Sequence, residues 1–322
     1  MELSGINAFL IEQYLTFKRN MGYTLSCTSN FKTFDDFTIK EGANSIGLTK
    51  ELANKWMEQR PNEAAVTRYK RVNDIRNFCV YLNQLGYRSY IPRLPKKYQS
   101  TFTPYIFSKE ELNSFFTACD TIRVKDKTSN MKFILPIVFR LIYGCGLRIN
   151  EAMSLKSKDV NLDEGYIIVR ETKNGSDRIL PLSDSLIIIC RQYNKTIHLS
   201  VNDPDDYFFI QKNGDRYASD TIYRWFRKIL WEAGISHGGK GLGPRVHDLR
   251  HSFSVHSLAE MSRKGLDLYY SLPILSKYLG HNSLEATDKY VRLTSDMYPE
   301  LIEDVNKLCS YLFPEVEQNE TY

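Results

Sequence analysis

The segment GCGLRINEA, Gly144–Ala152, begins at the end of the longest apolar run of the chain, Phe133–Cys145. Its two glycines let the backbone bend tightly, so the sequence predicts a turn that leads into a helix and places Arg148 in its first turn. There the guanidinium could hold an anion between its parallel N–H groups, beside the free backbone N–H groups of the helix. Taken alone, the simpler interpretation is a surface arginine that follows a glycine turn.

Around this segment, the apolar spacing predicts helices for most of the chain. Helical spacing is found at 6–17, 29–40, from 49 onward, from about 62 to 86 and after about 219, and Ser108–Glu111 fits a capping box that opens a helix. Strand signals are few: Gly165–Glu171 and Arg178–Leu182 flank the hairpin pair Asn174-Gly175, and Tyr207–Ile210 is the candidate for a third strand. The predicted fold class is therefore mainly α with a small antiparallel β-sheet.

A basic stretch with two prolines, Ile91–Lys97, separates the N-terminal helices from the rest of the chain. Prolines and basic residues without an apolar period are typical of an extended linker. We therefore expect a helical domain at 1–90, a basic linker at 91–104 and a larger α+β domain at 105–322.

Positive charge is concentrated in the N-terminal third of the chain. Residues 1–100 carry 15 Lys/Arg and 9 Asp/Glu, whereas the remaining residues carry 28 and 29. This concentration favours a polyanionic partner, chiefly nucleic acid, although a solvated helix face would have the same composition. The candidate DNA contacts are the basic residues of the last predicted N-terminal helix and of the linker: Arg68, Lys70, Arg71, Arg76, Arg93, Lys96 and Lys97.

The composition excludes several classes of protein. With 322 residues, 42% of them hydrophobic and 25% charged, the chain is long enough for two domains and is neither fibrous nor wholly disordered. The run Phe133–Cys145 is too short and too charged to span a bilayer, and the N-terminus lacks a signal-peptide pattern. The six cysteines form no CxxC pair, so we expect free buried thiols. These features predict a cytoplasmic protein without a membrane partner.

Two further segments carry residues suited to chemistry. The hairpin Glu171–Gly175 presents Lys173, although a lysine at a hairpin tip usually only aids solubility. The segment His247–His251 places two imidazoles and Arg250 on one face of a helix. A zinc site of the HExxH type would need Glu at position 248, where Asp248 stands, so an anion is the better candidate ligand.

The last such segment is Leu279–Ser283, in which His281 precedes Tyr290 by nine residues. In order and spacing, these segments resemble the tyrosine recombinase family, also called the phage integrase family. The family pattern is an Arg in a glycine-led turn, a Lys in a β-hairpin, a His-x-x-Arg, a Gly-His and a Tyr nine residues later. The resemblance covers Gly144–Tyr290 and implies a helical core-binding domain of SAM-like fold followed by a catalytic domain.

The resemblance implies a role for each matching residue. Tyr290 would be the nucleophile that attacks the scissile phosphodiester, Arg148 and Arg250 would clamp its non-bridging oxygens, and Lys173 would protonate the leaving 5′-oxygen. Fixed cations suit this chemistry because they stabilise the charge of the pentacoordinate phosphate and lower the pKa of a phenol, which is about 10 in water. No metal ion or other cofactor is implied.

The remaining matches are supporting residues. His247 would be the general acid/base that assists Tyr290, and His281 would donate a further hydrogen bond to the phosphate. Glu151 matches the acidic residue that supports the first arginine of the pattern. His251 matches a frequent histidine to which we assign only a structural role.

The sequence departs from the family pattern at one point, because 31 residues separate Arg250 from His281, longer than the usual interval. We expect the extra length in Met261–Pro273, as a lengthened connection between helices. Farther along, apolar residues at helical spacing within 301–312 predict an amphipathic helix, which could pack on its own domain. The resemblance implies instead that this segment docks on a neighbouring protomer.

The functional hypothesis is a site-specific DNA recombinase that cleaves and rejoins DNA through a covalent 3′-phosphotyrosine, as in integration or excision of mobile DNA or resolution of DNA dimers. It would bind double-stranded core sites with inverted repeats, form a tetramer on DNA, work at the nucleoid, and take an accessory DNA-bending protein as a further partner. Two alternatives remain open: a type IB topoisomerase-like enzyme that only relaxes DNA, and a non-catalytic DNA-binding relative.

Overall fold

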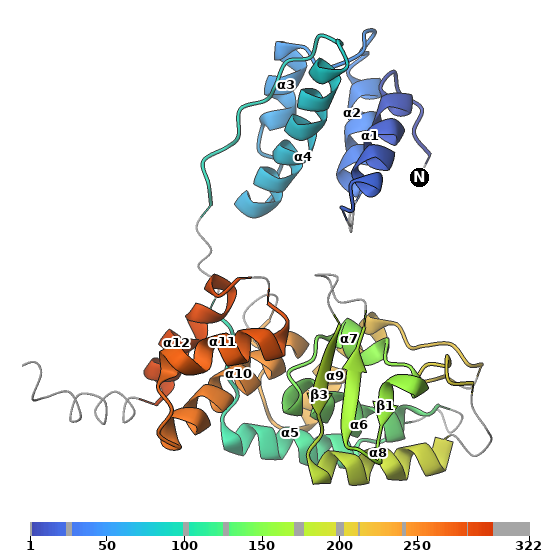
Figure 1. The fold of residues 1–322 in the computed structure, drawn as a ribbon. Helices are drawn as coiled ribbons and strands as arrows, with labels where there is room; N and C mark the ends of the chain where they lie inside the picture. Colours follow the sequence, from blue (N-terminus) through green and yellow to red (C-terminus); the bar gives the residue numbers. More distant parts are fainter. Residues whose placement is uncertain are drawn as a thin grey trace, which may run out of the picture. The chain divides into compact units, whose positions relative to one another are not determined.

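The computed structural model describes residues 2–23, 28–98, 103–124, 129–170, 177–197, 203–211, 213–239, 243–281 and 283–298. The chain divides into two compact units, Met1–Phe102 and Thr103–Tyr322 (Figure 1). The division falls within the segment expected to be a linker. None of the helices in the described ranges is both long and apolar enough to cross a membrane.

The first unit is a bundle of helices, which in the described residues are α1 (Ala8–Asn20), α2 (Ser29–Lys40), α3 (Lys50–Met57) and α4 (Ala65–Gln84). Aromatic residues fill its core: the ring of Trp56 packs edge-on against Phe34 at 5.2 Å between centroids, and Phe34 packs against Phe78 at 6.3 Å. All three side chains are buried. The helices lie where the apolar spacing predicts them.

Arg71, expected from its charge to contact DNA, is buried inside this unit. Its guanidinium donates to both carboxylate oxygens of Glu63, at 2.7 and 2.8 Å, and to the backbone carbonyls of Trp56 and Glu58. Only 2% of the residue is exposed, so Arg71 ties α4 to the end of α3 and cannot reach a phosphate in this conformation. The predicted DNA contact at Arg71 is therefore wrong, because charge alone does not show which side of a helix faces the core.

The other basic candidates of the first unit remain at its surface. Exposed among them are Lys70, Arg93, Lys96 and Lys97. Arg68 and Arg76 are half-buried and donate to backbone carbonyls, Arg68 to Met57 at 2.8 Å and Arg76 to Pro92 at 2.7 Å. The second of these bonds holds the start of the linker against α4.

The second unit combines helices with a small sheet. Its described helices are α5 (Lys109–Thr121), α6 (Met131–Gly144), α7 (Ile149–Met153), α8 (Asp184–Ile197), α9 (Ser219–Glu232), α10 (Val246–Arg263), α11 (Leu268–Leu279) and α12 (Glu285–Met297), with a 3₁₀ turn at Ser157–Asp159. The predicted capping box opens α5, since the Ser108 hydroxyl accepts from the Glu111 N–H and the Glu111 carboxylate accepts from the Ser108 N–H. Figure 1 shows α10, α11 and α12 together on one side of this unit and the strands on the other.

The sheet is antiparallel, as predicted, with strand order β1-β2-β3. The strands are β1 (Val160–Asn161), β2 (Tyr166–Val169) and β3 (Arg178–Pro181). The register pairs Ile167 with Leu180, and both side chains are buried. The predicted third strand at Tyr207–Ile210 is wrong: these residues form only isolated bridges, to Lys156 and Arg216. The strand β1 takes its place, but two residues are too few to give a periodic signal.

The connection between α10 and α11 is shorter than expected. Because α10 runs to Arg263 and α11 begins at Leu268, most of Met261–Pro273 is helical and four residues connect the two helices. The side chain of Asp267 caps α11 by accepting from two backbone N–H groups in its first turn. The expected lengthened connection is therefore wrong, and the helices themselves take up the residues.

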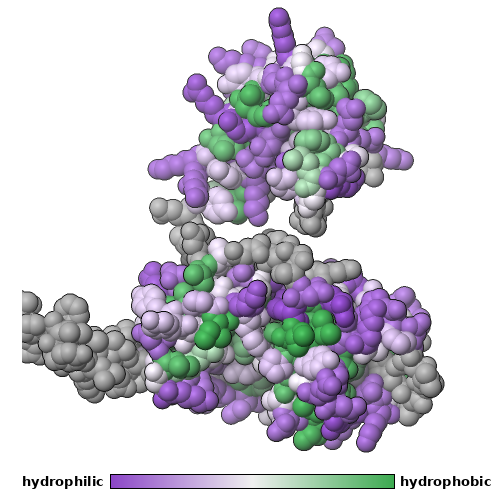
Figure 2. Space-filling model, viewed as in Figure 1, coloured by the Kyte–Doolittle hydropathy of each residue, from purple (hydrophilic) through white to green (hydrophobic). Residues whose placement is uncertain are grey.

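Apolar side chains are gathered inside the two units. On the faces seen in Figure 2, hydrophilic residues predominate and apolar residues form separate patches. A cluster centred on α10, α11 and α12 contains Val255, Leu275, Leu279 and Tyr290. This cluster packs the three helices together, and Leu279 in it lies beside the glycine turn described below.

Candidate active site

The glycine turn positions the first arginine of the sequence pattern. Gly146 has a φ of +59°, in the left-handed region that favours glycine, and a Cβ atom there would approach the ring of Phe253 to 2.7 Å. The turn leaves Arg148 at the N-cap of α7. The Glu151 carboxylate accepts from the Arg148 backbone N–H at 2.8 Å and from its guanidinium at 2.7 Å. These bonds fix the orientation of Arg148.

Glu151 also binds a second arginine, which the sequence analysis did not single out. Arg178, on β3, donates two hydrogen bonds to the Glu151 carboxylate, at 3.2 and 2.7 Å. Burial would raise the pKa of Glu151, but the hydrogen bonds from Arg178 and from the Arg148 backbone outweigh it, so the pKa lies below its usual value. The ionised carboxylate therefore joins the glycine turn to the sheet.

Arg250, the second arginine of the pattern, is fully buried on α10. It donates to the backbone carbonyl of Gly146 at 2.6 Å and to that of Leu279 at 2.7 Å, and it lies 3.2 Å from Nε2 of His281. Burial and the charge of Arg148 lower its pKa to about 10, so it stays protonated at neutral pH. Its Nε atom, which is also buried, has no hydrogen-bond partner among the described residues, and its Nη1 atom lies 3.7 Å from a carboxylate oxygen of Glu151.

The tyrosine of the pattern lies in the same cluster, against a different histidine from the one expected. Tyr290 is only 1% exposed, and its hydroxyl is 2.7 Å from Nδ1 of His251. The expected partner, His247, lies one helical turn away on α10, with its ring 4.6 Å from that of His251. Burial raises the pKa of Tyr290, and a hydrogen bond with Ser254 and the charges of Arg250 and Arg148 only partly offset the effect. The phenol is therefore protonated at neutral pH.

The two histidines of the pattern are neutral at physiological pH. Withdrawal from bulk water, and then the charges of Arg250 and Arg148, lower the pKa of both His247 and His281 to about 4. His281 Nδ1 lies 2.7 Å from the Thr287 hydroxyl, which fixes its ring. Within the described ranges, no group of three or more His, Cys, Asp or Glu residues is arranged to hold a metal ion.

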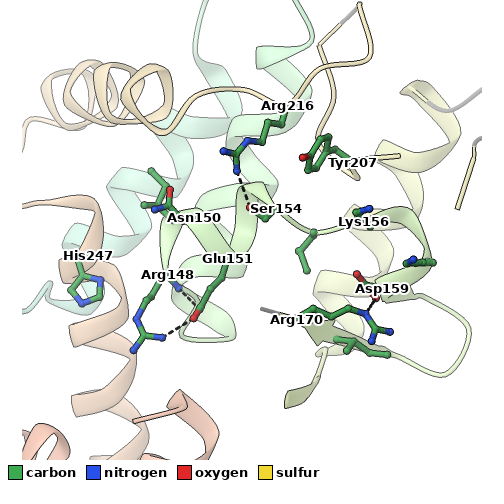
Figure 3. A pocket seen from close by; sticks show the side chains of 14 residues that line it. Arg148, Asn150, Glu151, Ser154, Lys156, Asp159, Arg170, Tyr207, Arg216 and His247 are labelled. Carbon is green, nitrogen blue, oxygen red and sulfur yellow. Dashed lines mark hydrogen bonds and ion pairs between the residues drawn. The ribbon is translucent and has the colours of Figure 1, made fainter. Parts of the chain in front are cut away.

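A cleft of about 770 Å³ lies beside this cluster (Figure 3). Arg148, Glu151 and His247 line it, together with residues of α7 and of the sheet. Arg250 and Tyr290 do not line the cleft and are buried next to it. The structure thus gathers Arg148, Glu151, His247, Arg250, His281 and Tyr290, but a molecule in the cleft reaches only some of them in this conformation.

Lys173 lies outside the described residues, as does the predicted amphipathic helix at 301–312. Sequence reasoning missed the contacts of Arg178 and His251. The alternation of β3 could have placed Arg178 on one face of the sheet, but nothing in the sequence links it to Glu151. For His251, the four-residue spacing from His247 shows a shared helix face and leaves open which ring lies deeper.

The sequence comparisons assign the family. The model of the "Phage integrase family" matches residues 106–297, which is more than half of the chain, and the chain therefore belongs to this family of tyrosine recombinases. It is 28% identical over 297 residues to a putative integrase/recombinase, y4rB, of Sinorhizobium fredii, covering 90% of this chain and 94% of the relative. It is 31% identical over 213 residues to the tyrosine recombinase XerA of Pyrococcus horikoshii, covering 66% and 63%.

Solved structures show the same fold. The XerH site-specific recombinase in a post-cleavage complex with a palindromic difH substrate matches with a TM-score of 0.63 at 20% identity, covering 87% of this chain and 77% of that one. A lambda integrase dimer bound to a COC′ core site matches with a TM-score of 0.60 at 15% identity, covering 88% and 94%. The mostly helical architecture with a small antiparallel sheet is therefore that of a tyrosine recombinase, as the sequence predicts.

Proposed function

We propose that this protein is a site-specific DNA recombinase that cleaves and rejoins DNA through a covalent 3′-phosphotyrosine. The observation that carries the proposal is the convergence on Arg250. Its guanidinium bonds the carbonyl of Gly146 in the glycine turn and the carbonyl of Leu279 before His281, and the helix that bears it also supplies the partner of Tyr290. One buried arginine thus joins segments that are far apart in the sequence.

Each residue of the site has a defined role in the proposed reaction. The Tyr290 oxygen attacks the phosphorus while Arg148 and Arg250 stabilise the charge on the non-bridging oxygens. The bond to the 5′-oxygen breaks, and Lys173 supplies the proton that makes this oxygen a hydroxyl. The incoming 5′-hydroxyl of another strand reverses these steps and releases Tyr290. In this proposal His281, held beside Arg250, donates a further hydrogen bond to the phosphate once its Nε2 atom has left the Arg250 guanidinium.

Two features of the resting structure qualify the role of the histidines. Because the Tyr290 hydroxyl is bound to His251 and buried, it has to leave this contact before a phosphodiester can reach it. His247 lines the cleft in a neutral form, where it can accept the phenol proton once the hydroxyl has moved. We therefore propose that His251 holds the resting nucleophile and that His247 serves the reacting one.

The assembly is also a proposal. Recombination requires two duplexes, so we propose binding to inverted-repeat core sites and a tetramer on DNA, helped by an accessory DNA-bending protein. The proposed phosphate contacts of the N-terminal unit and linker are the exposed residues Lys70, Arg93, Lys96 and Lys97. The half-buried Arg68 and Arg76 are further proposed contacts. The segment 301–312 is proposed to dock on a neighbouring protomer, and the nucleoid is the proposed place of action.

The decisive experiment is Tyr290→Phe. Duplexes retained by the protein from a random pool first define a binding site. A nicked suicide version of that site is then incubated with the wild type and the variant, and covalent adducts are separated on a denaturing gel. We expect the adduct to disappear while site binding changes less than about threefold, because one hydroxyl is removed and every cation remains. Adduct formation by Tyr290→Phe would show that another residue is the nucleophile.

The control is Tyr223→Phe, which removes a hydroxyl from an exposed position on α9 and should leave the adduct unchanged. The same protein preparation also distinguishes a recombinase from a type IB topoisomerase-like enzyme. A recombinase joins two differently marked sites, whereas a type IB topoisomerase-like enzyme only relaxes supercoils. Absence of both adduct and joined products from the wild type would leave the non-catalytic DNA-binding alternative.

A further inference from the structure

The cations that line the cleft differ in how they are neutralised. Arg148 is paired with Glu151, and Arg170 with Asp159 at 2.5 Å. Two lysines share one carboxylate, since Lys156 and Lys158 both bind Asp205. These pairs leave the cleft with less free positive charge than its lining residues suggest.

Arg216 is different from its neighbours in the cleft. Its guanidinium donates to the hydroxyl of Ser154 at 3.0 Å, and among the described residues it has no carboxylate partner. The side chain is exposed. Figure 3 shows it reaching into the cleft over Ser154, between Asn150 and Tyr207. An uncompensated guanidinium beside a hydroxyl is a donor set that suits a phosphate oxygen.

The position of Arg216 relative to Arg148 is set by the short helix α7. Arg148 is the N-cap of α7 and Ser154 its C-cap. Six residue steps at 1.5 Å per residue separate the two ends by about 9 Å. One strand of B-DNA carries one phosphate for about every 3.4 Å of the helix axis, so a separation of this size leaves room for two phosphates of the same strand. A strand whose scissile phosphate lies on Arg148 can therefore bring another phosphate to Arg216.

We propose that Arg216, supported by Ser154, binds a second backbone phosphate of the strand that is cleaved, close to the scissile phosphate. The proposal rests on the proposed function, since it assumes that the cleft receives DNA. Arg216 makes no contact with the reacting atoms and is a positioning residue, which holds the strand in register while Arg148 and Arg250 act on the scissile phosphate.

The test measures the salt dependence of DNA binding with the full chain. A short fluorescent duplex of arbitrary sequence is titrated with protein at a series of KCl concentrations, and log K is plotted against log salt. The variants are Arg216→Gln, Ser154→Asp and Ser154→Ala. Ser154→Asp places beside Arg216 a carboxylate like those that pair with the other cleft cations, at an exposed position. Ser154→Ala leaves Arg216 without one.

We expect Arg216→Gln and Ser154→Asp to reduce the magnitude of the slope by about 0.9, the contribution of one phosphate contact. The slope for Ser154→Ala should match that of the wild type. The matched control is Arg140→Gln, which removes the same charge from an arginine already bound by both of its terminal nitrogens to Asp120, at 2.8 and 2.7 Å. Its slope should also be unchanged.

The proposal is overturned if neither Arg216→Gln nor Ser154→Asp lowers the slope, or if Arg140→Gln lowers it as much. The proposed function fails separately, and visibly, if the wild type itself shows no salt-dependent binding to duplex DNA. The register role is checked on the selected site. There Arg216→Gln should lower the rate of adduct formation at saturating protein, and Arg140→Gln should not.

Discussion

Tyr290 and His251 show how a single helical turn decides the chemistry available to a residue. His247 and His251 share one face of α10, and the family pattern points to the first of them as the partner of the tyrosine. The structure gives the 2.7 Å contact to the second. His247 lines the cleft instead. The spacing of the residues predicts the shared face, but depth within the molecule depends on what packs above the helix.

A double-mutant cycle tests this contact. We expect His251→Leu and Tyr290→Phe to be coupled by about 0.5–1.5 kcal/mol in the free energy of unfolding, since each removes one half of the same buried hydrogen bond. The cycle of His247→Leu with Tyr290→Phe is the control and should be additive to within about 0.3–0.5 kcal/mol. Urea unfolding of the four variants and the wild type measures both values. A larger coupling energy with His247 than with His251 would show that the Tyr290 hydroxyl bonds His247 and would contradict the contact with His251.

Acidification should destabilise the folded protein. Burial first, and then neighbouring cations, lower the pKa of His247, His251 and His281, so the unfolded chain binds protons near pH 5 that these folded histidines do not. Burial raises the pKa of Asp248 to about 6, and this group acts in the opposite direction. The unfolded state should therefore bind about one to two more protons between pH 5 and pH 7, which makes stability rise with pH.

Urea unfolding at several pH values in this window measures the proton difference. His247 contributes less than the other two histidines because, although part of its ring is withdrawn from bulk water, it lies at the surface of the cleft, where solvent screens the charges around it. The variant His251→Leu should lower the pH dependence by about one proton, since its folded state no longer contains one depressed pKa. A protein that becomes more stable between pH 7 and pH 5 would contradict the neutral state of these rings.

At the scale of elements, the sequence predicts whatever depends on local pattern. The helices, the capping box at Ser108 and the paired strands follow from apolar spacing and turn residues, and the structure confirms them. The strand β1 does not follow because two residues are too few to give a periodic signal, and the burial of Arg71 does not follow because it depends on how α4 packs against the end of α3. Arg71 belongs to a basic helix, yet Glu63 and two carbonyls draw its side chain into the core.

The glycine turn before α7 provides an element-scale prediction. Gly146→Ala places a Cβ atom within 2.7 Å of Phe253 and 2.9 Å of Leu279, in a left-handed backbone conformation. We expect a loss of about 2–4 kcal/mol in unfolding free energy, since strain at positive φ adds to overpacking. The control is Gly214→Ala, where φ is +85° but nothing lies within 4 Å, and the loss should be only about 1 kcal/mol. If urea unfolding gave the same loss of unfolding free energy for both variants, close packing would not be the reason for glycine at position 146.

At the scale of the whole molecule, the sequence predicts two units. The basic stretch with two prolines has no apolar helical pattern, so it cannot pack into the core of either unit. The chain divides at Phe102/Thr103, and each side has its own buried cluster. The roles of the units on DNA stay predictions, since they depend on contacts with a partner and not on the sequence pattern of either unit. The family pattern locates the catalytic cluster, while contacts such as Arg178–Glu151 and Arg216–Ser154 emerge only from the tertiary structure.

The linker provides the last prediction, which concerns how both units hold one duplex. Arg93, Lys96 and Lys97 are exposed, and within the described residues the structure pairs none of them with a carboxylate. Replacing all three by Gln should reduce the magnitude of the salt slope of DNA binding by about 2–3, close to 0.9 for each phosphate that the linker no longer neutralises. The control replaces Lys32, Lys55 and Lys264, whose ammonium groups already bind Asp36, Glu41 and Glu260. Both triple variants remove the same charge, so net charge alone would flatten the two slopes equally. A slope reduced only in the linker variant places this segment against phosphates, whereas equal slopes would show that the connection between the units runs clear of the DNA.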